Sequence, residues 1–258
     1  MTALLEVDRL NKRFGGLHAV RNVSFALDAG TITGVLGPNG AGKTTIFNLL
    51  TGFIPFDTGS VRLAGRSLGG LAAHRIVNLG LARTFQLARP FMGMTVLENV
   101  EVPCLAPRVR HEGHPRARAL ALLDQVGLTE KAAMAVDILP YGDLRRLEIA
   151  RALATKPKVL LLDEPFAGLG ASEIDPLAAL IRSLHCSEGL TILIIEHKLR
   201  EFMQLVNTVI AIDFGEIIAV GDPATIVRDR RVVEAYLGKD ELGRSSDVPN
   251  AGAGDGAA

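Results

Sequence analysis

The sequence predicts an α/β fold with a mainly parallel sheet, an antiparallel β subdomain at the N-terminus and a helical subdomain inserted into the core. Three observations predict this architecture. Apolar runs at 31–36, 158–163 and 191–195 are typical of strands that are covered on both faces. Between residues 4 and 27 the apolar positions alternate instead, which favours antiparallel strands. From Leu87 to Leu139 the apolar periodicity becomes helical.

The composition limits the classes of protein to which the chain can belong. Its 28 basic and 28 acidic side chains balance, which argues against a broad nucleic-acid-binding surface, so we expect no nucleic acid partner. Two cysteines, Cys104 and Cys186, are too few for a disulfide framework and lack a metal-ligand spacing, which favours a reducing cytosolic setting. The first residues do not resemble a signal peptide, and the apolar runs are too short to cross a bilayer. We therefore expect a protein that is soluble by itself and reaches a membrane only through a partner.

A glycine-rich segment between the first buried strand and a helix beginning near Ile46 carries the strongest chemical signal. Its Gly-x-x-x-x-Gly-Lys-Thr pattern predicts a phosphate-binding loop, and hence a P-loop nucleotide hydrolase core. Glycines let backbone N–H groups converge on phosphate oxygens, Lys43 can reach the β- and γ-phosphates, and the Thr44 hydroxyl can hold Mg²⁺. A glycine-rich turn that binds nothing is the disfavoured alternative, because the expected strand and helix flank the loop. The predicted nucleotide-binding residues are Gly37, Pro38, Asn39, Gly40, Ala41, Gly42, Lys43, Thr44 and Thr45.

Two side chains on either side of this loop are candidates for further nucleotide contacts. Phe14 closes an N-terminal strand before a glycine turn, where it could stack on a base or, equally well, fill the core under the hairpin. A turn and strand at 55–63, a short helix at 72–78 and a strand at 81–85 follow. Gln86 stands at the end of that last strand, from which its amide could reach Mg²⁺ or the attacking water. Taken alone, a glutamine in this position is more often an ordinary surface residue.

The helical segment that comes next predicts a second subdomain. Thr95 and Glu98 have the spacing of a capping box, which begins a helix, and another helix is expected over 117–126. We interpret the nearby arginines as a solvated face; they are Arg108, Arg110, Arg116 and Arg118. Together with the first part of a helix predicted over 144–155, the insert makes a helical subdomain of about residues 87–150.

Acidic and histidine side chains follow two of the buried strands. Asp163 ends the strand at 158–163 and could bind Mg²⁺, and Glu164 beside it could polarise a water molecule. An isolated Asp-Glu pair is usually only a strand terminus, but a phosphate loop in the same chain makes a nucleotide site the better explanation. His197 follows the strand at 191–195, and ligands in open α/β sheets gather at the carboxyl ends of strands. A lone histidine is more often structural, but this position favours a role near the γ-phosphate.

The remaining segments are expected to complete the core. The pattern predicts a helix over 173–184, a hairpin of strands at 208–212 and 216–220, and short helices at 223–228 and 232–237. From Lys239 onward, small and polar residues dominate without periodicity. We therefore expect one folded domain over 1–238 and a disordered tail over 239–258.

This set of motifs resembles the ATP-binding subunits of ABC transporters, over about residues 5–238. Several motifs in the same order are much more specific than any one of them. The resemblance assigns the Walker A loop to Gly37–Thr45, Walker B to Leu160–Asp163, the catalytic glutamate to Glu164, the Q-loop glutamine to Gln86, the switch histidine to His197 and the adenine-stacking aromatic to Phe14.

The segment 139–143 resembles the signature motif, which in this family contacts the γ-phosphate of ATP held by the opposite subunit. It reads Leu-Pro-Tyr-Gly-Asp where the family has Leu-Ser-Gly-Gly-Gln, so Pro140 offers neither a hydroxyl nor an N–H. The backbone of Tyr141 and Gly142 at the start of a helix is then the expected nucleotide contact. Gly170 is a second departure, because the family has an aspartate at this D-loop position.

Within the family, four strings are most similar to the larger ATPase of branched-chain amino-acid importers: Gly80–Gln86, Met94–Val100, Arg145–Leu153 and Val233–Gly238. The resemblance implies ATP and Mg²⁺ as cofactors, and an ATP-hydrolysing subunit that energises uptake of branched-chain or related amino acids. It implies a peripheral location on the cytoplasmic face of the inner or plasma membrane. The implied partners are a second ATPase subunit, identical or homologous, the transmembrane permease subunits and, indirectly, a substrate-binding protein.

Other functions fit many of the same motifs. An ABC ATPase for urea, amides or an envelope lipid is the nearest alternative. A non-transport ABC ATPase in DNA repair or on the ribosome usually carries two cassettes or a long coiled-coil insert, and this chain shows neither pattern. A nucleotide-binding scaffold without turnover is a third alternative, and Glu164 together with His197 argues against it.

Overall fold

The computed structural model describes residues 3–237, and the tail expected over 239–258 lies outside that range. The strands are β1 (Leu5–Phe14), β2 (Leu17–Leu27), β3 (Ile32–Leu36), β4 (Thr58–Leu63), β5 (Arg66–Ser67), β6 (Leu81–Arg83), β7 (Val159–Asp163), β8 (Thr191–Ile195), β9 (Thr208–Asp213) and β10 (Glu216–Gly221). The helices are α1 (Lys43–Leu50), α2 (Ala73–Leu79), α3 (Val96–Cys104), α4 (Pro115–Gln125), α5 (Tyr141–Leu153), α6 (Ala171–Glu188), α7 (Leu199–Leu205), α8 (Pro223–Ile226) and α9 (Arg230–Leu237).

The larger sheet has six strands in the order β10-β9-β3-β8-β7-β6. Every neighbouring pair is parallel except β9 with β10, which form an antiparallel hairpin. The central strands are apolar on both faces because each face covers a separate core. In β3, Ile32 and Leu36 enter the core formed with α5 to α8, whereas Val35 enters the core formed with α1 and the smaller sheet. The predicted mainly parallel α/β fold is therefore confirmed.

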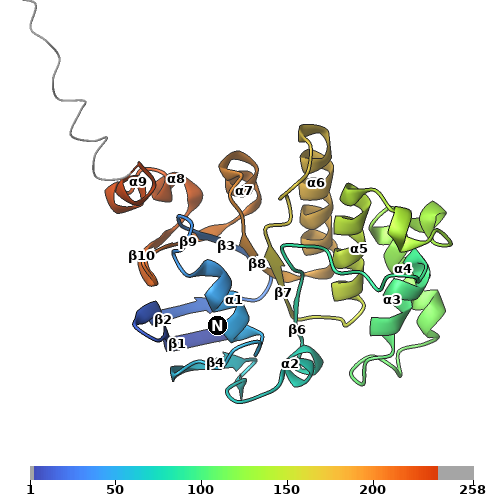
Figure 1. Ribbon diagram of the computed structural model, residues 1–258, viewed down its shortest axis with the longest axis horizontal. Coiled ribbons are helices and arrows are strands. Elements are labelled where there is room, and N and C mark those ends of the chain that lie inside the picture. The colour runs from blue at the N-terminus through green and yellow to red at the C-terminus, as the bar shows by residue number, and fades with distance from the viewer. Residues whose placement is uncertain (1–2, 238–258) are drawn as a thin grey trace, which may run out of the picture.

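The smaller sheet is antiparallel, with the order β2-β1-β4-β5, and it contains the predicted N-terminal strands. Its inward side chains pack with α1 against the face of the larger sheet that α6 and α7 do not cover (Figure 1). This arrangement encloses α1 between two sheets. The loop that precedes α1 consequently opens at the edge where the two sheets meet.

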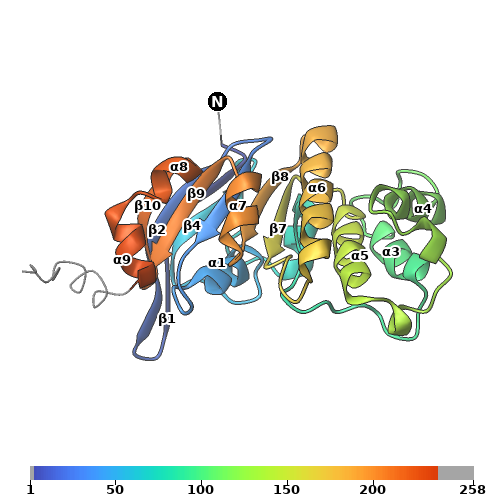
Figure 2. The ribbon, with the colours of Figure 1, turned by 90° about the horizontal axis from the view of Figure 1, so that it is seen from above.

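Helices α3, α4 and α5 form the helical layer beyond the β6 end of the larger sheet (Figure 2). The predicted capping box at the start of α3 is confirmed, because Thr95 Oγ1 accepts the N–H of Glu98 and Glu98 Oε2 accepts the N–H of Thr95. The interpretation of the arginines as a solvated face is wrong for Arg118. Its guanidinium donates to the backbone carbonyls of Cys104, Val109 and Ala154, and so ties α4 to the segments around it.

Several elements differ from the expectation, among them α1, which begins at Lys43 rather than near Ile46, and α6, which spans Ala171–Glu188 rather than 173–184. Helix α7 was not predicted, and it lies so close to β3 that a Cβ on Gly34 would come within 2.2 Å of the Phe202 ring. Strand β6 ends at Arg83 rather than at 85, and α5 begins at Tyr141 rather than at 144, with Pro140 as its N-cap. Across residues 3–237, none of the helices combines the length and the apolar character that a membrane span requires.

Candidate nucleotide site

A cavity of about 340 Å³ lies between the smaller sheet and the glycine-rich loop. Most of the residues predicted to bind nucleotide line it, although they come from segments far apart in the chain. Its walls combine an aromatic edge, the loop backbone and the ends of two buried strands. Among its lining residues are Phe14, Asn39, Gly40, Ala41, Gly42, Lys43, Thr44, Thr45, Glu164 and His197.

The loop is folded around the side chain of Lys43, which is 5% exposed. Its Nζ donates to the carbonyl oxygens of Gly37 at 2.6 Å and Pro38 at 2.9 Å. Those two residues therefore shape the loop and do not line the cavity. Burial lowers the pKa of Lys43, and the charges of Glu164 and Asp163 oppose that shift. A phosphate group here would replace carbonyl dipoles with full negative charge around the ammonium.

Gly42 is required at the end of the loop for two reasons. Its φ of +103° is a conformation that other residues rarely adopt, and a Cβ there would lie 2.5 Å from the carbonyl oxygen of Ala19 in β2.

The first residue of the loop contacts a helix that comes much later in the chain. The N–H of Gly37 donates to the Tyr236 hydroxyl of α9 at 2.9 Å. No pattern in the sequence predicts this contact between Gly37 and Tyr236.

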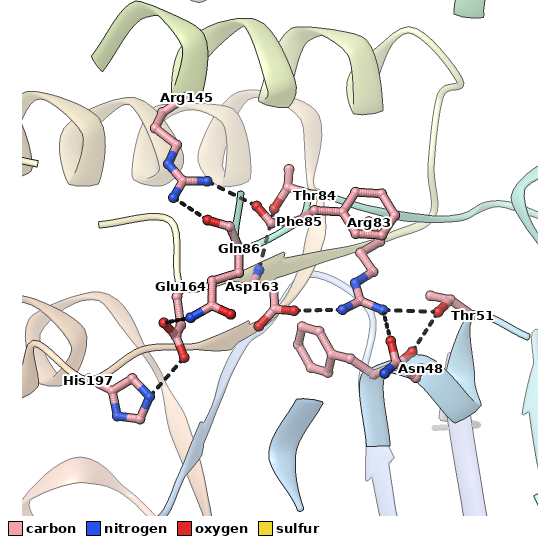
Figure 3. A network of polar contacts seen from close by, with 11 residues as sticks. Asn48, Thr51, Arg83, Thr84, Phe85, Gln86, Arg145, Asp163, Glu164 and His197 are labelled. Carbon is pink, nitrogen blue, oxygen red and sulfur yellow. Dashed lines mark hydrogen bonds and ion pairs between the residues drawn. The ribbon is translucent and has the colours of Figure 1, made fainter. Parts of the chain in front are cut away.

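Glu164, Gln86 and His197 meet at the edge of the cavity (Figure 3). Gln86 Nε2 donates to Glu164 Oε2 at 2.7 Å, and His197 Nε2 lies 2.8 Å from Glu164 Oε1. The backbone of Glu164 has a φ of +48°, and its N–H donates to the carbonyl of Ile195 at 2.9 Å. Such strained backbone clusters at functional sites. Gln86 and His197 thus each contact one oxygen of the Glu164 carboxylate, and the two contacts fix the orientation of that group.

Asp163 lies beneath this group and is almost entirely buried. Its Oδ2 accepts a 2.6 Å hydrogen bond from Arg83, whereas its Oδ1 is buried with no hydrogen-bond partner among residues 3–237. Burial raises the pKa of Asp163, and the hydrogen bond and charge of Arg83 oppose that shift. Arg83 belongs to the string Gly80–Gln86, but nothing in that string predicts its contact with Asp163, which lies 80 residues away in the chain.

The residues present fit Mg²⁺. An unpartnered carboxylate oxygen and the Thr44 hydroxyl are the hard oxygen donors that Mg²⁺ prefers, and the ion usually takes its remaining ligands from phosphates and water. Among the described residues there is no cluster of three or more His, Cys, Asp or Glu side chains that could hold a metal.

Tyr141 and Gly142 lie apart from this cavity, at the start of α5. The Tyr141 hydroxyl accepts a 2.6 Å hydrogen bond from Arg145, and its ring lies over Gly168. A Cβ on Gly142 would come within 2.4 Å of Glu173 Oε1. The structure therefore does not bring these two predicted residues together with the loop of the same chain.

The buried side chain of Arg145 joins the start of α5 to Gln86. Its guanidinium donates to the carbonyl of Gln86 at 2.5 Å and to that of Phe85 at 3.0 Å. The same group pairs with Glu148 one turn further along the helix. Displacement of α5 would thus act directly on the backbone of the residue that contacts Glu164.

The chain matches two family models and is similar to known transport proteins. The model described as "ABC transporter" matches residues 20–167, and that described as "Branched-chain amino acid ATP-binding cassette transporter" matches residues 216–241. The high-affinity branched-chain amino acid transport ATP-binding protein BraF of Pseudomonas aeruginosa is 40% identical, over 92% of this chain and 98% of that protein. LivG of Escherichia coli K12, named for the same transport, has the same identity and coverage.

Among solved structures, the ADP conformation of an ATP-binding cassette of an ABC transporter superposes with a TM-score of 0.84 at 29% identity. The superposition covers 93% of this chain and all of that one. With the glycine-rich loop, the Asp163-Glu164 pair and His197 placed around one site in this fold, the chain belongs to the ABC transporter family, as an ATP-hydrolysing cassette subunit.

Proposed function

We propose that this subunit energises the import of branched-chain or related amino acids. The observation that carries the proposal is the family match at residues 216–241, which lies beyond the segment common to ABC cassettes in general. The names of BraF and LivG, which align along nearly their whole length, support the same substrate class. An ABC ATPase for urea, amides or an envelope lipid remains the alternative that a transport assay must exclude.

The geometry supports a role for each residue around the cavity. The loop Gly37–Thr45 binds the phosphates through its N–H groups and Lys43, and Phe14 stacks on the base. Glu164 acts as the general base or as the main group that orients the attacking water. Gln86 and His197 hold its two oxygens and so fix the direction in which a lone pair points. When bound, Mg²⁺ neutralises charge on the β- and γ-phosphates, and Thr44, Asp163 and Gln86 are the residues that would hold it.

The start of α5 supports a site completed by two subunits. Cassettes of this family act as dimers together with transmembrane components. In our proposal, the N–H groups of Tyr141 and Gly142 contact the γ-phosphate bound to the opposite subunit, which is either identical or homologous to this one. The unpaired donors of a helix N-terminus and its dipole favour an anion there. The separation of these residues from the loop of their own chain supports this reading.

An exposed apolar segment supports contact with the permease. Leu87, Phe91 and Met92 are 67%, 40% and 65% exposed, and exposed apolar side chains that gather in one segment are typical of interaction surfaces. They lie next to a groove of about 210 Å³ between β6 and the helical layer, lined in part by Phe85, Phe91 and Val102. We propose that the helical subdomain of residues 87–150 docks the permease here, on the cytoplasmic face of the membrane, within a cassette domain that spans residues 1–238.

Uptake measurements test the proposed substrate. Cells that lack the gene for this subunit should lose high-affinity uptake of labelled leucine, isoleucine and valine and regain it with the wild-type gene. The same gene carrying Lys43→Ala should not restore uptake, because the phosphate loop would lose its ammonium. Loss of urea or amide uptake, with normal uptake of the three amino acids, would contradict the proposal in favour of the alternative.

A further inference from the structure

Arg83 lies in β6, directly before the Q-loop, and its side chain is only 6% exposed. It makes two short hydrogen bonds with the ends of its guanidinium. Nη2 donates to Asp163 Oδ2 at 2.6 Å, and Nη1 donates to Asn48 Oδ1 at 2.6 Å (Figure 3). Three aromatic rings surround its planar group, those of Phe47, Phe53 and Phe85, with centroids at 4.9 to 5.7 Å.

The two partners of Arg83 belong to different halves of the candidate metal site. Asn48 lies on α1, one helical turn after Thr44, so the two side chains project from the same face of that helix. Asp163 ends β7 in the middle of the larger sheet. The guanidinium thus spans the gap between the element that supplies the Thr44 hydroxyl and the strand that supplies the carboxylate.

The bond to Arg83 also distinguishes the two oxygens of Asp163. Oδ2 is fixed by a planar donor that cannot rotate away from its aromatic surroundings. Oδ1 points away from Arg83 (Figure 3), and it is buried without a hydrogen-bond partner in the described part of the chain. Because Arg83 holds Oδ2, the carboxylate can offer only Oδ1 to a metal ion. In a carboxylate without such a bond, rotation would exchange the two oxygens.

We propose that Arg83 is a positioning residue for the metal of the bound nucleotide: it holds Asp163 Oδ1 and Thr44 in the relative placement that the ion needs. This inference rests on the proposed nucleotide site. Partners that orient a metal-binding side chain typically change metal affinity by about 10- to 100-fold when they are removed. A purely structural role would instead affect the fold, or nucleotide binding with and without metal alike.

The test compares Arg83→Met and Arg83→Lys with a matched control, Arg118→Met. Arg118 is a half-buried arginine whose hydrogen bonds among residues 3–237 go to backbone carbonyls in the helical layer, away from Asp163. Nucleotide affinity of the full chain is measured with a fluorescent ATP analogue, in EDTA and in increasing Mg²⁺. Binding of Mn²⁺ to the ATP complex is followed by electron paramagnetic resonance, which needs no turnover.

We expect Arg83→Met to bind nucleotide in EDTA as the wild type does, and to need about 10- to 100-fold more metal for half-saturation. Arg83→Lys should show a smaller increase, because a single ammonium cannot reproduce the planar fork, and it keeps the test informative if the methionine variant does not fold. Arg118→Met should show the wild-type metal dependence.

Unchanged or tighter metal binding in a folded Arg83 variant would overturn the inference, because Arg83 would then be irrelevant or a competitor of the ion. An equal loss of affinity in EDTA and in Mg²⁺ would overturn it as well. Both outcomes leave the proposed nucleotide site intact. A wild-type chain that binds no ATP would instead count against the proposed function itself.

Discussion

Gln86 and Glu164 are 78 residues apart in the chain, and they are joined by a 2.7 Å hydrogen bond from the Gln86 amide to Oε2 of the carboxylate. His197 lies at the other oxygen, Oε1, and Arg145 holds the backbone of Gln86. The Glu164 carboxylate, which would act on water, is therefore oriented by two side chains, and Arg145 in turn positions one of them. Arg145 belongs to α5, the helix that begins with the signature segment.

We expect Glu164→Gln to keep ATP binding and to lose turnover by roughly two to four orders of magnitude, because an amide cannot accept the proton of the attacking water. Steady-state hydrolysis by the reconstituted transporter measures the loss, and nucleotide binding is measured on the isolated chain. Glu130→Gln, at the surface of the helical layer, is the control. Near-normal hydrolysis by Glu164→Gln would contradict the proposed role of Glu164 as the general base or water-orienting group.

Phe14→Ala should weaken ATP binding by roughly 5- to 150-fold, since stacking of a base on an aromatic side chain contributes about 1 to 3 kcal/mol. The ring lies at the cavity wall and is 46% exposed, so its removal opens no large hole in the core. Phe14→Tyr should bind ATP as the wild type does. Equal affinities of all three proteins in a binding titration would show that Phe14 does not contact the base.

Replacement of Pro140 by serine tests the unusual signature. The residue is the N-cap of α5, a position that serine favours by about 1 kcal/mol, while loss of the proline ring costs about 0.4 to 1 kcal/mol through the unfolded chain. These effects offset, so stability should hardly change. We expect ATPase activity to stay within about tenfold, a shift of ~1.4 kcal/mol in the barrier. A hundredfold loss would mean that proline itself is needed at this position.

Gly142→Asp should abolish hydrolysis while the single subunit still binds ATP, because the new carboxylate would face the γ-phosphate of the opposite subunit. The structure adds a second reason, since any Cβ at this position must displace Glu173. The double variant Gly142→Asp with Glu173→Ala separates the two causes. Recovery in the double variant would assign the defect to Glu173. Full activity of Gly142→Asp alone would mean that this signature does not face a hydrolytic site.

Cysteine crosslinking tests the docking segment. In a background with the exposed Cys186 replaced by serine, Phe91→Cys and Met92→Cys should crosslink to the permease in an ATP-dependent manner. Leu199→Cys is the control, because it is also exposed but lies on α7, away from the groove. Crosslinks that cluster on 158–199 instead of 87–100 would contradict the proposed surface.

The sequence predicts the fold well because its elements have strong local signals. The buried strands are continuous apolar runs, and the capping box at Thr95 and the loop at 37–45 have short, specific patterns. Helix α7 lacks such a signal. Its seven residues are too few to establish a periodicity, and its place depends on Gly34, which admits the Phe202 ring against β3.

The candidate site likewise contains residues whose positions could be predicted from the sequence and residues whose positions could not. The positions of Glu164 and His197 could be predicted because each lies within two residues of the end of a buried strand, where backbone direction largely determines the position. Arg83 and Tyr236 could not be predicted, because their roles depend on side chains that reach across the fold to partners 80 and 199 residues away. A local sequence pattern does not indicate a contact between residues that lie so far apart in the chain.

The bond between Tyr236 and Gly37 bears on how the chain is made. Strand β3 and the loop leave the ribosome early, but β8 and β9, which flank β3, and the tyrosine that holds Gly37 come much later in the chain. At translation rates of about 5 to 20 residues per second, the 199 residues between Gly37 and Tyr236 take on the order of 10 to 40 s. For most of that interval, until β8 and β9 have been synthesised, β3 lacks both of its parallel neighbours. The glycine-rich loop is thus synthesised early, but its hydrogen bond from Gly37 to Tyr236 forms late.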